Sequence, residues 1–449
     1  MRSILLTVLI LHFILKLTYA QTDEKIWNLQ ECIEFAIQNN LDLRNQTLNL
    51  DILHNNYQQS KYDLLPNLNA SSSFSNSFGQ TFSEDQVKFV DERVTSFNIG
   101  IFTSVQLFEG LRKYHTINRN LLEKENGQTR YEILKNQITL EIVNTYLQII
   151  YNSEHTKIIE EQLLITEQQI EKTKKLIQSG SIPSGDLYTL LSQKADEASQ
   201  IITYKNLTKQ ATLSLTQAMN LNSTGVEIFR PQIDSLHLME SLPPVIDSIY
   251  SDALNFMPEL KYAEIQQQLL HKDMKITKSG YYPSLSLSAG FSGNYNNLAV
   301  DLATGSQDYP FFDQLGDKRQ AQISLNLSIP IFSKFNNRTN VQNIKINIEQ
   351  ADNDILRTKQ DIYKVIQSAY NDVIASVENM NARQQAVFAS EESFRYAEQR
   401  YNAGAIGVID YNLEKNKLNQ AKSKLLQSKF DLLVKIKILE FYRGIELKL

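Results

Sequence analysis

Short stretches of the chain alternate between hydrophobic and polar residues. In 284–292 and 321–329, hydrophobic residues occupy every second position, and small or polar residues stand between them. Residues 95–105 follow the same period, and residues 67–78 follow it weakly, with more serine and asparagine. Successive side chains of a strand point to opposite faces. The pattern therefore predicts strands with one apolar and one polar face, at 67–78, 95–106, 284–292 and 321–330.

The stretches between these segments contain few helix breakers. Residues 112–179 contain one glycine and no proline, and residues 334–402 contain neither. At 1.5 Å per residue, each would form a helix about 100 Å long. A helix of that length must pack lengthwise against other helices. The expected helices are 28–65, 112–179, 186–220, 245–282, 334–402 and 410–443.

The last of these helices carries a heptad repeat. The residues that recur at every seventh position are Tyr411, Leu418, Leu425, Leu432 and Leu439. This spacing is typical of a coiled-coil seam. We therefore expect the long helices to pair along such seams.

The same order of elements occurs twice along the chain. Pro66 in the first half corresponds to Pro283 in the second, and Phe108 corresponds to Phe332. Each proline is expected to end a helix, because proline lacks an amide donor and restricts the residue before it. These four residues mark the helix–strand junctions of two repeats, residues 21–230 and 231–449.

A polar, glycine-containing stretch joins the two strands of each half. It spans 79–94 in the first half and 293–320 in the second, and we expect both to be loops. The second stretch is longer, so the two phenylalanines are separated by more of the chain than the two prolines are.

A glycine interrupts each long helical stretch at the equivalent position. Gly180 and Gly404 have the same separation along the chain as Phe108 and Phe332. An aspartate follows each glycine at the same interval, at Asp186 and Asp410. Glycine suits the left-handed C-cap of a helix, and aspartate suits an N-cap. We expect a tight turn after each glycine, with the aspartate capping the returning helix.

The first twenty residues predict a secretory signal. Arg2 is followed by an apolar run that closes with Ala20. A membrane anchor is the alternative interpretation. Without residues 1–20, 43 basic and 50 acidic residues remain, which gives a net charge of −7 and argues against nucleic-acid binding. The single cysteine, Cys32, cannot form an internal disulfide.

The sequence offers no pattern typical of an enzyme or a metal site. The six histidines are scattered, and no two of them are three or four residues apart. Phosphate-binding loops and nucleophile elbows are absent from the sequence. We therefore expect no catalysis, no cofactor and no metal.

The two-faced strands favour a membrane barrel. An apolar face suits lipid and a Ser/Asn/Gln face suits a watery lumen. Four strands are too few to close a barrel, so several copies must contribute, and three copies would supply twelve strands. A soluble two-layer protein with amphipathic strands is the alternative.

This combination resembles the TolC-like outer-membrane efflux protein family. The duplicated helix–strand–strand–helix order covers nearly all of the chain after residue 25. The most specific segments are "LIQSGSIPSGDLY" in the first half and "RYNAGAIGVIDY" in the second. The resemblance implies a homotrimer with a twelve-stranded barrel in the outer membrane of a Gram-negative bacterium. It also implies a helical tunnel in the periplasm, and passive export driven by an inner-membrane transporter through a periplasmic adaptor.

The resemblance also implies roles for particular residues. The adaptor-binding tips correspond to Gly180, Ser181, Asp186, Gly404, Ala405 and Gly407. The periplasmic entrance corresponds to Tyr401, Asp410 and Glu414. Leu413 stands where the family has a second acid, and Ile406 stands where it has a basic partner for the tyrosine.

The sequence is also compatible with other functions. A secreted, soluble coiled-coil interaction protein is the main alternative to a channel. Within the channel interpretation, the cargo (drug, metal or protein) and the class of transporter are undetermined by the sequence.

Overall fold

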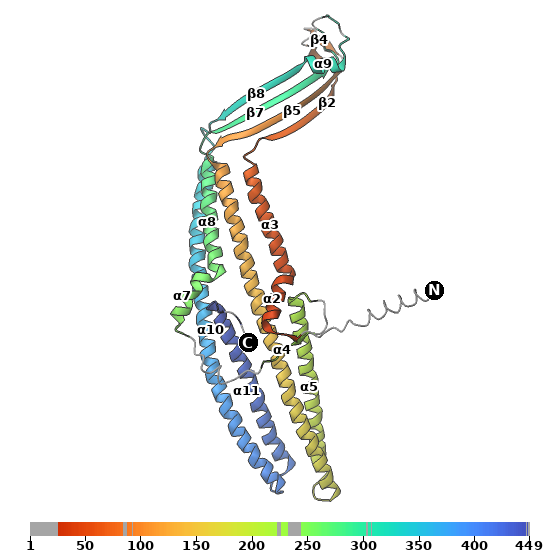
Figure 1. Cartoon of the computed structure of the whole chain (residues 1–449), viewed down its shortest axis with the longest axis vertical. Coiled ribbons are helices and arrows are strands. Elements are labelled where there is room, and N and C mark those ends of the chain that lie inside the picture. Colours follow the sequence, from red (N-terminus) through yellow and green to blue (C-terminus); the bar gives the residue numbers. More distant parts are fainter. Residues whose placement is uncertain are drawn as a thin grey trace, which may run out of the picture. The chain divides into compact units, whose positions relative to one another are not determined.

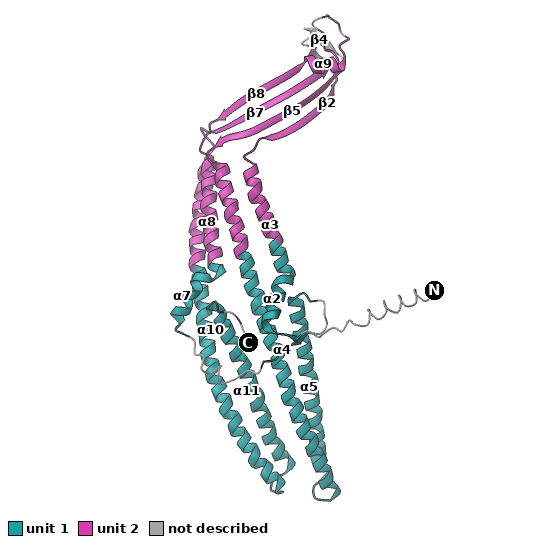
Figure 2. Cartoon of the chain, in the orientation of Figure 1, with its two compact units in different colours: residues 1–47, 130–260, 357–449 teal, residues 48–129, 261–356 magenta. Residues whose placement is uncertain are grey.

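The computed structural model describes most of the chain (Figure 1). The described residues are 26–83, 88–91, 93–221, 226–231, 244–301, 304–306, 308–445 and 447. The expected signal sequence, 1–20, lies outside them. The chain forms two compact units (Figure 2). Unit 1 comprises residues 1–47, 130–260 and 357–449, and unit 2 comprises residues 48–129 and 261–356.

Unit 2 contains a four-stranded antiparallel sheet in the order β2–β5–β7–β8. The strands are β2 (Asn67–Ser77), β5 (Val94–Glu109), β7 (Ser284–Asn296) and β8 (Arg319–Ser328). All four predicted strands are confirmed. Strands from both repeats meet at the β5–β7 pair, which leaves β2 and β8 as the two edges of the sheet.

Parts of the segments that join the strands form secondary structure that was not predicted. The expected loop 79–94 contains the hairpin strands β3 (Gln80–Ser83) and β4 (Lys88–Asp91), and the expected loop 293–320 contains the helix α9 (Phe311–Asp317). The rings of Phe82 and Phe89 pack 5.3 Å apart across the hairpin. In α9, Gln314 is buried and accepts a hydrogen bond from the Asn296 amide at 3.0 Å. These contacts stabilise the β3–β4 pair and α9.

The helices agree with the predicted order. They are α2 (Leu29–Asn39), α3 (Leu41–Tyr62), α4 (Arg112–Gln178), α5 (Gly185–Ala218), α7 (Ile246–Phe256), α8 (Pro258–Ser279), α10 (Asn336–Asn402) and α11 (Val408–Tyr442). Within the described residues, no helix is both long enough and apolar enough to cross a membrane. The heptad seam of α11 is confirmed at Tyr411, Leu418, Leu432 and Leu439, which are buried, while Leu425 is partly buried.

Two predicted helices are each divided in two, which corrects the sequence interpretation. The predicted helix 28–65 breaks at Asn40, and 245–282 breaks at Met257, where ψ is 131° and 119°. At the first break, the Asn40 side chain accepts the Asp42 amide at 2.9 Å. At the second, Pro258 disfavours a helical conformation for the residue before it. The two breaks have the same separation along the chain as Pro66 and Pro283, so the repeat preserves them.

The apolar core of unit 1 surrounds the middle of α4. Tyr146 is almost fully buried, and its hydroxyl donates to the Phe229 carbonyl at 2.6 Å. Burial raises the pKa of the Tyr146 hydroxyl above its ordinary value. The bond joins α4 to a short parallel pair of strands, β1 (Ile26–Trp27) and β6 (Glu227–Ile228).

Candidate functional site

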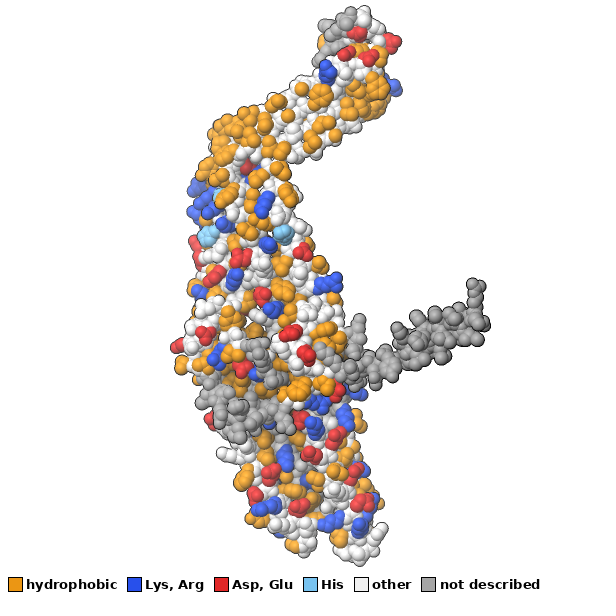
Figure 3. Space-filling view, viewed as in Figure 1, with side chains coloured by type: hydrophobic (Ala, Val, Ile, Leu, Met, Phe, Trp, Pro, Cys, Tyr) orange, Lys and Arg blue, Asp and Glu red, His pale blue; other side chains and the backbone are white. Residues whose placement is uncertain are grey.

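The sheet of unit 2 has two chemically different faces. Hydrophobic side chains such as Leu68, Ile99, Phe291 and Ile323 lie exposed on one face, and Ile323 is 80% exposed. The strands in Figure 3 present hydrophobic and uncharged side chains along their length, whereas charged side chains are spread over the helices. A large exposed apolar surface marks a site of contact with lipid or another protein. The structure confirms the predicted alternation.

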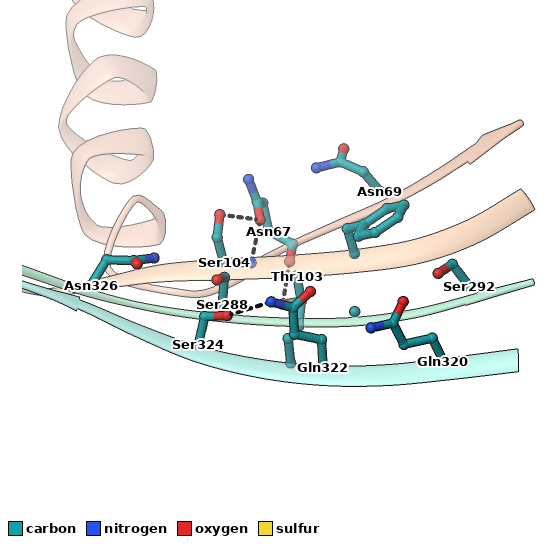
Figure 4. A pocket seen from close by; sticks show the side chains of 13 residues that line it. Asn67, Asn69, Thr103, Ser104, Ser288, Ser292, Gln320, Gln322, Ser324 and Asn326 are labelled. Carbon is teal, nitrogen blue, oxygen red and sulfur yellow. Dashed lines mark hydrogen bonds between the residues drawn. The ribbon is translucent and has the colours of Figure 1, made fainter. Parts of the chain in front are cut away.

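The opposite face is polar and uncharged along a shallow groove of about 310 Å³ (Figure 4). The lining residues are Asn67, Asn69, Phe102, Thr103, Ser104, Ser288, Ala289, Gly290, Ser292, Gln320, Gln322, Ser324 and Asn326. Some of these side chains make hydrogen bonds across the strands. The Asn67 side-chain oxygen, for example, accepts the amide and the hydroxyl of Ser104, at 2.8 and 2.9 Å. The face therefore suits contact with water and neutral polar solutes.

The junction residues lie where the helices of unit 2 meet its strands. Pro66 and Pro283 stand directly before β2 and β7. Phe108 lies on β5 beside an irregularity in the pairing with β7. Phe332 follows β8 and packs edge-on against Phe335, with ring centroids 5.4 Å apart. Phe108 and Phe332 are both exposed in the single chain, so neither forms part of a core at the junction.

The turns after α4 and α10 in unit 1 have the same geometry. Gly180 and Gly404 have φ values of 73° and 72°, in the left-handed region. The glycine amide donates to the carbonyl three residues back, and the next amide, of Ser181 or Ala405, donates to the carbonyl five residues back. These N···O distances lie between 2.8 and 3.0 Å. Both helices thus end in a Schellman motif, which confirms the predicted C-caps.

The predicted N-caps are wrong. The helices α5 and α11 begin before the aspartates, with Ser184 and Gly407 at the N-cap positions. Asp186 and Asp410 therefore lie within the first turn of each helix. The N-cap of each helix lies two or three residues earlier than predicted, so the aspartate is already inside the helix and cannot take that role. A carboxylate in the first turn is still favourable, because it interacts with the positive end of the helix dipole.

A small apolar cluster holds the two turns near each other. Ile170 of α4, Leu190 of α5 and Val408 of α11 are buried together, and Tyr401 packs against them. The Tyr401 and Tyr411 rings lie 4.9 Å apart. The cluster joins the α4–α5 hairpin to the α10–α11 hairpin within unit 1.

A basic residue from another helix lies beside Tyr401, although Ile406 occupies the position where the family has a basic partner. Lys172 of α4 places its Nζ 5.5 Å from the centre of the Tyr401 ring and donates to Asn402 Oδ1 at 2.5 Å. A cation over an aromatic ring is attracted by the ring quadrupole. Lys172 therefore links the hairpins where Ile406 cannot.

The predicted entrance acids differ in their surroundings. Asp410 is exposed in the single chain. Glu414 accepts hydrogen bonds from Lys417 Nζ and from the Ser393 hydroxyl, each at 2.7 Å. The bond from Lys417 is the main cause that lowers the pKa of Glu414. Glu414 is therefore held by its own chain, whereas the Asp410 carboxylate faces solvent.

A buried ion pair, which the sequence analysis did not identify, also joins the hairpins. Lys415 of α11 and Glu197 of α5 are both buried, and Lys415 Nζ lies 3.6 Å from Glu197 Oε1. Thr166 of α4 donates to Glu197 Oε2 at 2.7 Å and accepts from Lys415. Gln193 donates to Glu197 at 2.9 Å, and the Gln162 carbonyl accepts from Lys415 at 3.3 Å. The charges are thus paired and hydrogen-bonded by three helices.

The burial of Lys415 could have been predicted from its spacing along α11. Lys415 follows the seam residue Tyr411 by four positions and precedes Leu418 by three, so it lies on the buried side of α11. Burial lowers the pKa of the Lys415 ammonium, and the charge of Glu197 acts in the opposite direction. Glu197 follows the buried Leu190 by seven positions.

The described residues contain no cluster of histidine, cysteine, aspartate and glutamate that could hold a metal ion. Cys32, the single cysteine, is buried in the core of unit 1. The sites that remain are the two faces of the sheet and the paired helix turns.

Comparisons with known proteins agree with this arrangement. The sequence matches the family described as "Outer membrane efflux protein" over residues 32–221 and 249–437. It is 21% identical to outer membrane protein TolC of Salmonella enteritidis over 417 residues, covering 91% of this chain and 80% of TolC. It is 25% identical to the probable efflux pump outer membrane protein TtgC of Pseudomonas putida over 403 residues, covering 86% of this chain and 75% of TtgC.

The fold resembles that of solved outer-membrane proteins. Against the crystal structure of VceC from Vibrio cholerae, the TM-score is 0.73 at 15% identity, covering 93% of this chain and 96% of VceC. That likeness shows a shared fold.

An exposed apolar strand face backed by an uncharged polar face, with long helix hairpins, defines a membrane channel protein. The chain belongs to the outer membrane efflux protein family. It is an outer-membrane channel built from two repeats, and the family consists of transport channels rather than enzymes. Neither the fold nor the comparisons support the soluble coiled-coil alternative.

Proposed function

We propose that three copies of this chain form a passive exit duct across the outer membrane. The observation that carries the proposal is the sheet of unit 2. Its edge strands β2 and β8 have no partner strand among the described residues beyond β5 and β7. Unpaired strand edges are not tolerated in lipid, where each backbone polar group needs a partner. Pairing β8 of one copy with β2 of the next removes every edge when three copies close a twelve-stranded barrel.

The helix turns are the proposed docking site for a periplasmic adaptor. At Gly180, Gly404 and Gly407, a Cβ atom would meet no neighbouring atom, so the backbone there is open to close approach. Ser181, Asp186 and Ala405 complete this surface. The adaptor would connect the duct to an inner-membrane transporter that supplies the energy. The relatives named as efflux pump components support this arrangement. The proposal specifies neither the cargo nor the class of transporter.

The same end of the helices is the proposed periplasmic entrance. Asp410 supplies a ring of three carboxylates in a trimer, with Tyr401 and Glu414 beside it. The Lys415–Glu197–Thr166 network, together with Lys172, holds the two hairpins of each copy together and keeps the entrance closed at rest. These bonds take the place of the tip bond for which Ile406 provides no donor.

Assembly of the purified protein tests the proposed duct. The full chain has a mass of 51.6 kDa. Extracted in detergent, the mature protein is expected to have about three times the mass of this chain without residues 1–20. An unheated sample is expected to migrate as a trimer on a denaturing gel and to shift to the monomer position after boiling. Light scattering with detergent correction checks the mass independently. A monomer or dimer that stays soluble without detergent would remove the barrel and the duct together.

The entrance acid gives a second prediction. Replacing Asp410 with alanine is expected to weaken block of the reconstituted channel by a trivalent cation about tenfold, because three converging carboxylates are lost. Single-channel current in a planar bilayer, with hexamminecobalt as the blocker, measures this. The matched control is Asp42→Ala, since Asp42 is also exposed in the first turn of a helix. Equal block of both variants would show that Asp410 does not line the pore.

A further inference from the structure

Phe102 departs from the pattern of the polar strand face. It points to the side that carries Asn98, Ser104 and the other polar residues of β5, and it is 45% exposed. Its ring lies over two glycines. A Cβ on Gly100 would be 2.8 Å from the ring, and a Cβ on Gly290 would be 2.7 Å from it. The two glycines therefore make room for an aromatic ring to lie against the sheet with one side open.

Uncharged amides flank the ring on both sides. Asn69 lies directly opposite Phe102 on β2, and Gln322 lies beyond Gly290 on β8, in the same transverse row. In the next row Gln320 lies opposite Ser292. Within the described part of the chain, the side chains of Asn69 and Gln320 make no hydrogen bond, whereas Gln322 donates to Ser324 at 3.1 Å. Free amide groups thus stand around one exposed aromatic face (Figure 4).

We propose that Phe102 and the surrounding amides form a binding subsite for a neutral saccharide on the inner wall of the channel. The inference rests on the proposed function, which places this face in the lumen. A pyranose ring has an apolar C–H face that stacks on an aromatic ring and a rim of hydroxyls that bond to amides. Asn69 and Gln322 are three strand spacings apart, about 14 Å, so the row accommodates a short oligosaccharide rather than a single sugar.

The composition of the groove favours this ligand over two others. An ion gains little from it, because none of the residues lining the groove is charged. A wholly apolar aromatic compound would cover Asn69 and Gln320 without bonding to them, which costs free energy. A saccharide satisfies the ring and the amides together. Such an open, solvated subsite is weak, with a dissociation constant on the order of 1 mM.

Channel current tests the subsite in the intact trimer. Maltotriose added on the extracellular side of a planar bilayer is expected to reduce the wild-type current reversibly and in a saturable way. In Phe102→Ala, the concentration for half reduction should rise about tenfold. Phe102→Leu keeps apolar cover over the glycines but lacks a flat ring, and it should behave like the alanine variant. Phe102→Trp should retain or strengthen the response.

Two controls separate the subsite from the fold and from the duct. Phe291→Ala removes the same side chain from the apolar face of β7 and should leave the maltotriose response unchanged. Detergents with sugar headgroups are avoided, since they compete for the site. Polyethylene glycol of similar size, which lacks hydroxyl rims, should give no saturable response.

The outcomes distinguish the two proposals. Failure to form conducting trimers would overturn the proposed duct. Conducting trimers that do not respond to maltotriose, or in which Phe102→Leu responds as strongly as the wild type, would overturn the saccharide subsite alone.

Discussion

Replacing Lys415 with methionine is expected to destabilise the paired hairpins and to open the channel at rest. The change leaves the Glu197 carboxylate buried without its counter-charge. Breaking a buried ion pair by removing one partner costs about 3–5 kcal/mol. Separation of α11 from α4 and α5 returns the unpaired carboxylate to water, so opening relieves this cost. Glu197→Gln leaves the Lys415 ammonium buried without its counter-charge, so it is also expected to destabilise the hairpins and open the channel.

The double variant Lys415→Met/Glu197→Leu is expected to avoid this destabilisation. Replacement of both charges by apolar groups of similar size is often neutral or stabilising. We expect melting temperature and resting conductance close to those of the wild type. Circular dichroism of the detergent-extracted trimer and planar-bilayer conductance measure the two quantities. The matched control is Lys205→Met, which breaks an exposed pair between α5 and α4, with a Lys205 Nζ to Glu160 Oε1 distance of 2.8 Å. An exposed pair contributes less than about 1 kcal/mol, so this variant should remain stable and closed.

The two single variants decide what the buried pair does. If Lys415→Met and Glu197→Gln are as stable as Lys205→Met, the pair is solvated and does not hold the hairpins. If both are unstable but the resting conductance stays at the wild-type level, the pair stabilises the fold without controlling the entrance.

The strands were predictable because their environment imposes a simple rule on the sequence. Each strand has one face toward an apolar surrounding and one toward a polar one, so the alternation is local and persists over its whole length. The two repeats strengthened the prediction, since a weak signal in 67–78 was supported by a strong one in 284–292. Gly180 and Gly404 were predictable for a similar local reason, the left-handed backbone that ends a helix.

The missed features depend on contacts between distant segments. Lys415 and Glu197 belong to different repeats, and each resembles a charged surface residue in its own helix. The alternation along β5 assigns Phe102 to the polar face, but it does not reveal that the ring lies over Gly290 of the other repeat. The Asn40 side chain accepts amides of the first turn of α3 and donates to the Ala218 carbonyl of α5 at 3.0 Å, which a helical pattern does not reveal. Residue types were enough to predict the elements, whereas the sites required knowledge of which segments meet in space.

Replacing Ile99 with lysine is expected to prevent insertion and trimer assembly almost completely. Ile99 lies on the apolar face of β5, one of the two central strands of the sheet. A lysine on the lipid face of a barrel costs about 2–4 kcal/mol at the middle of the bilayer. Because the barrel contains three copies, the cost is multiplied by the number of chains. The heat-modifiable trimer band and the outer-membrane fraction should both be lost.

The neighbouring position supplies the matched control. Asn98→Lys introduces the same charge one residue earlier, on the opposite face of the same strand, where the side chain meets water. It should assemble and insert like the wild type, because a lumen position keeps the ammonium hydrated. Both variants introduce lysine into the same strand, so its strand propensity is the same in each. A difference between them therefore reports the face on which the lysine lies. If both variants assemble equally well, the apolar face does not meet lipid, and the sheet must be covered by protein instead.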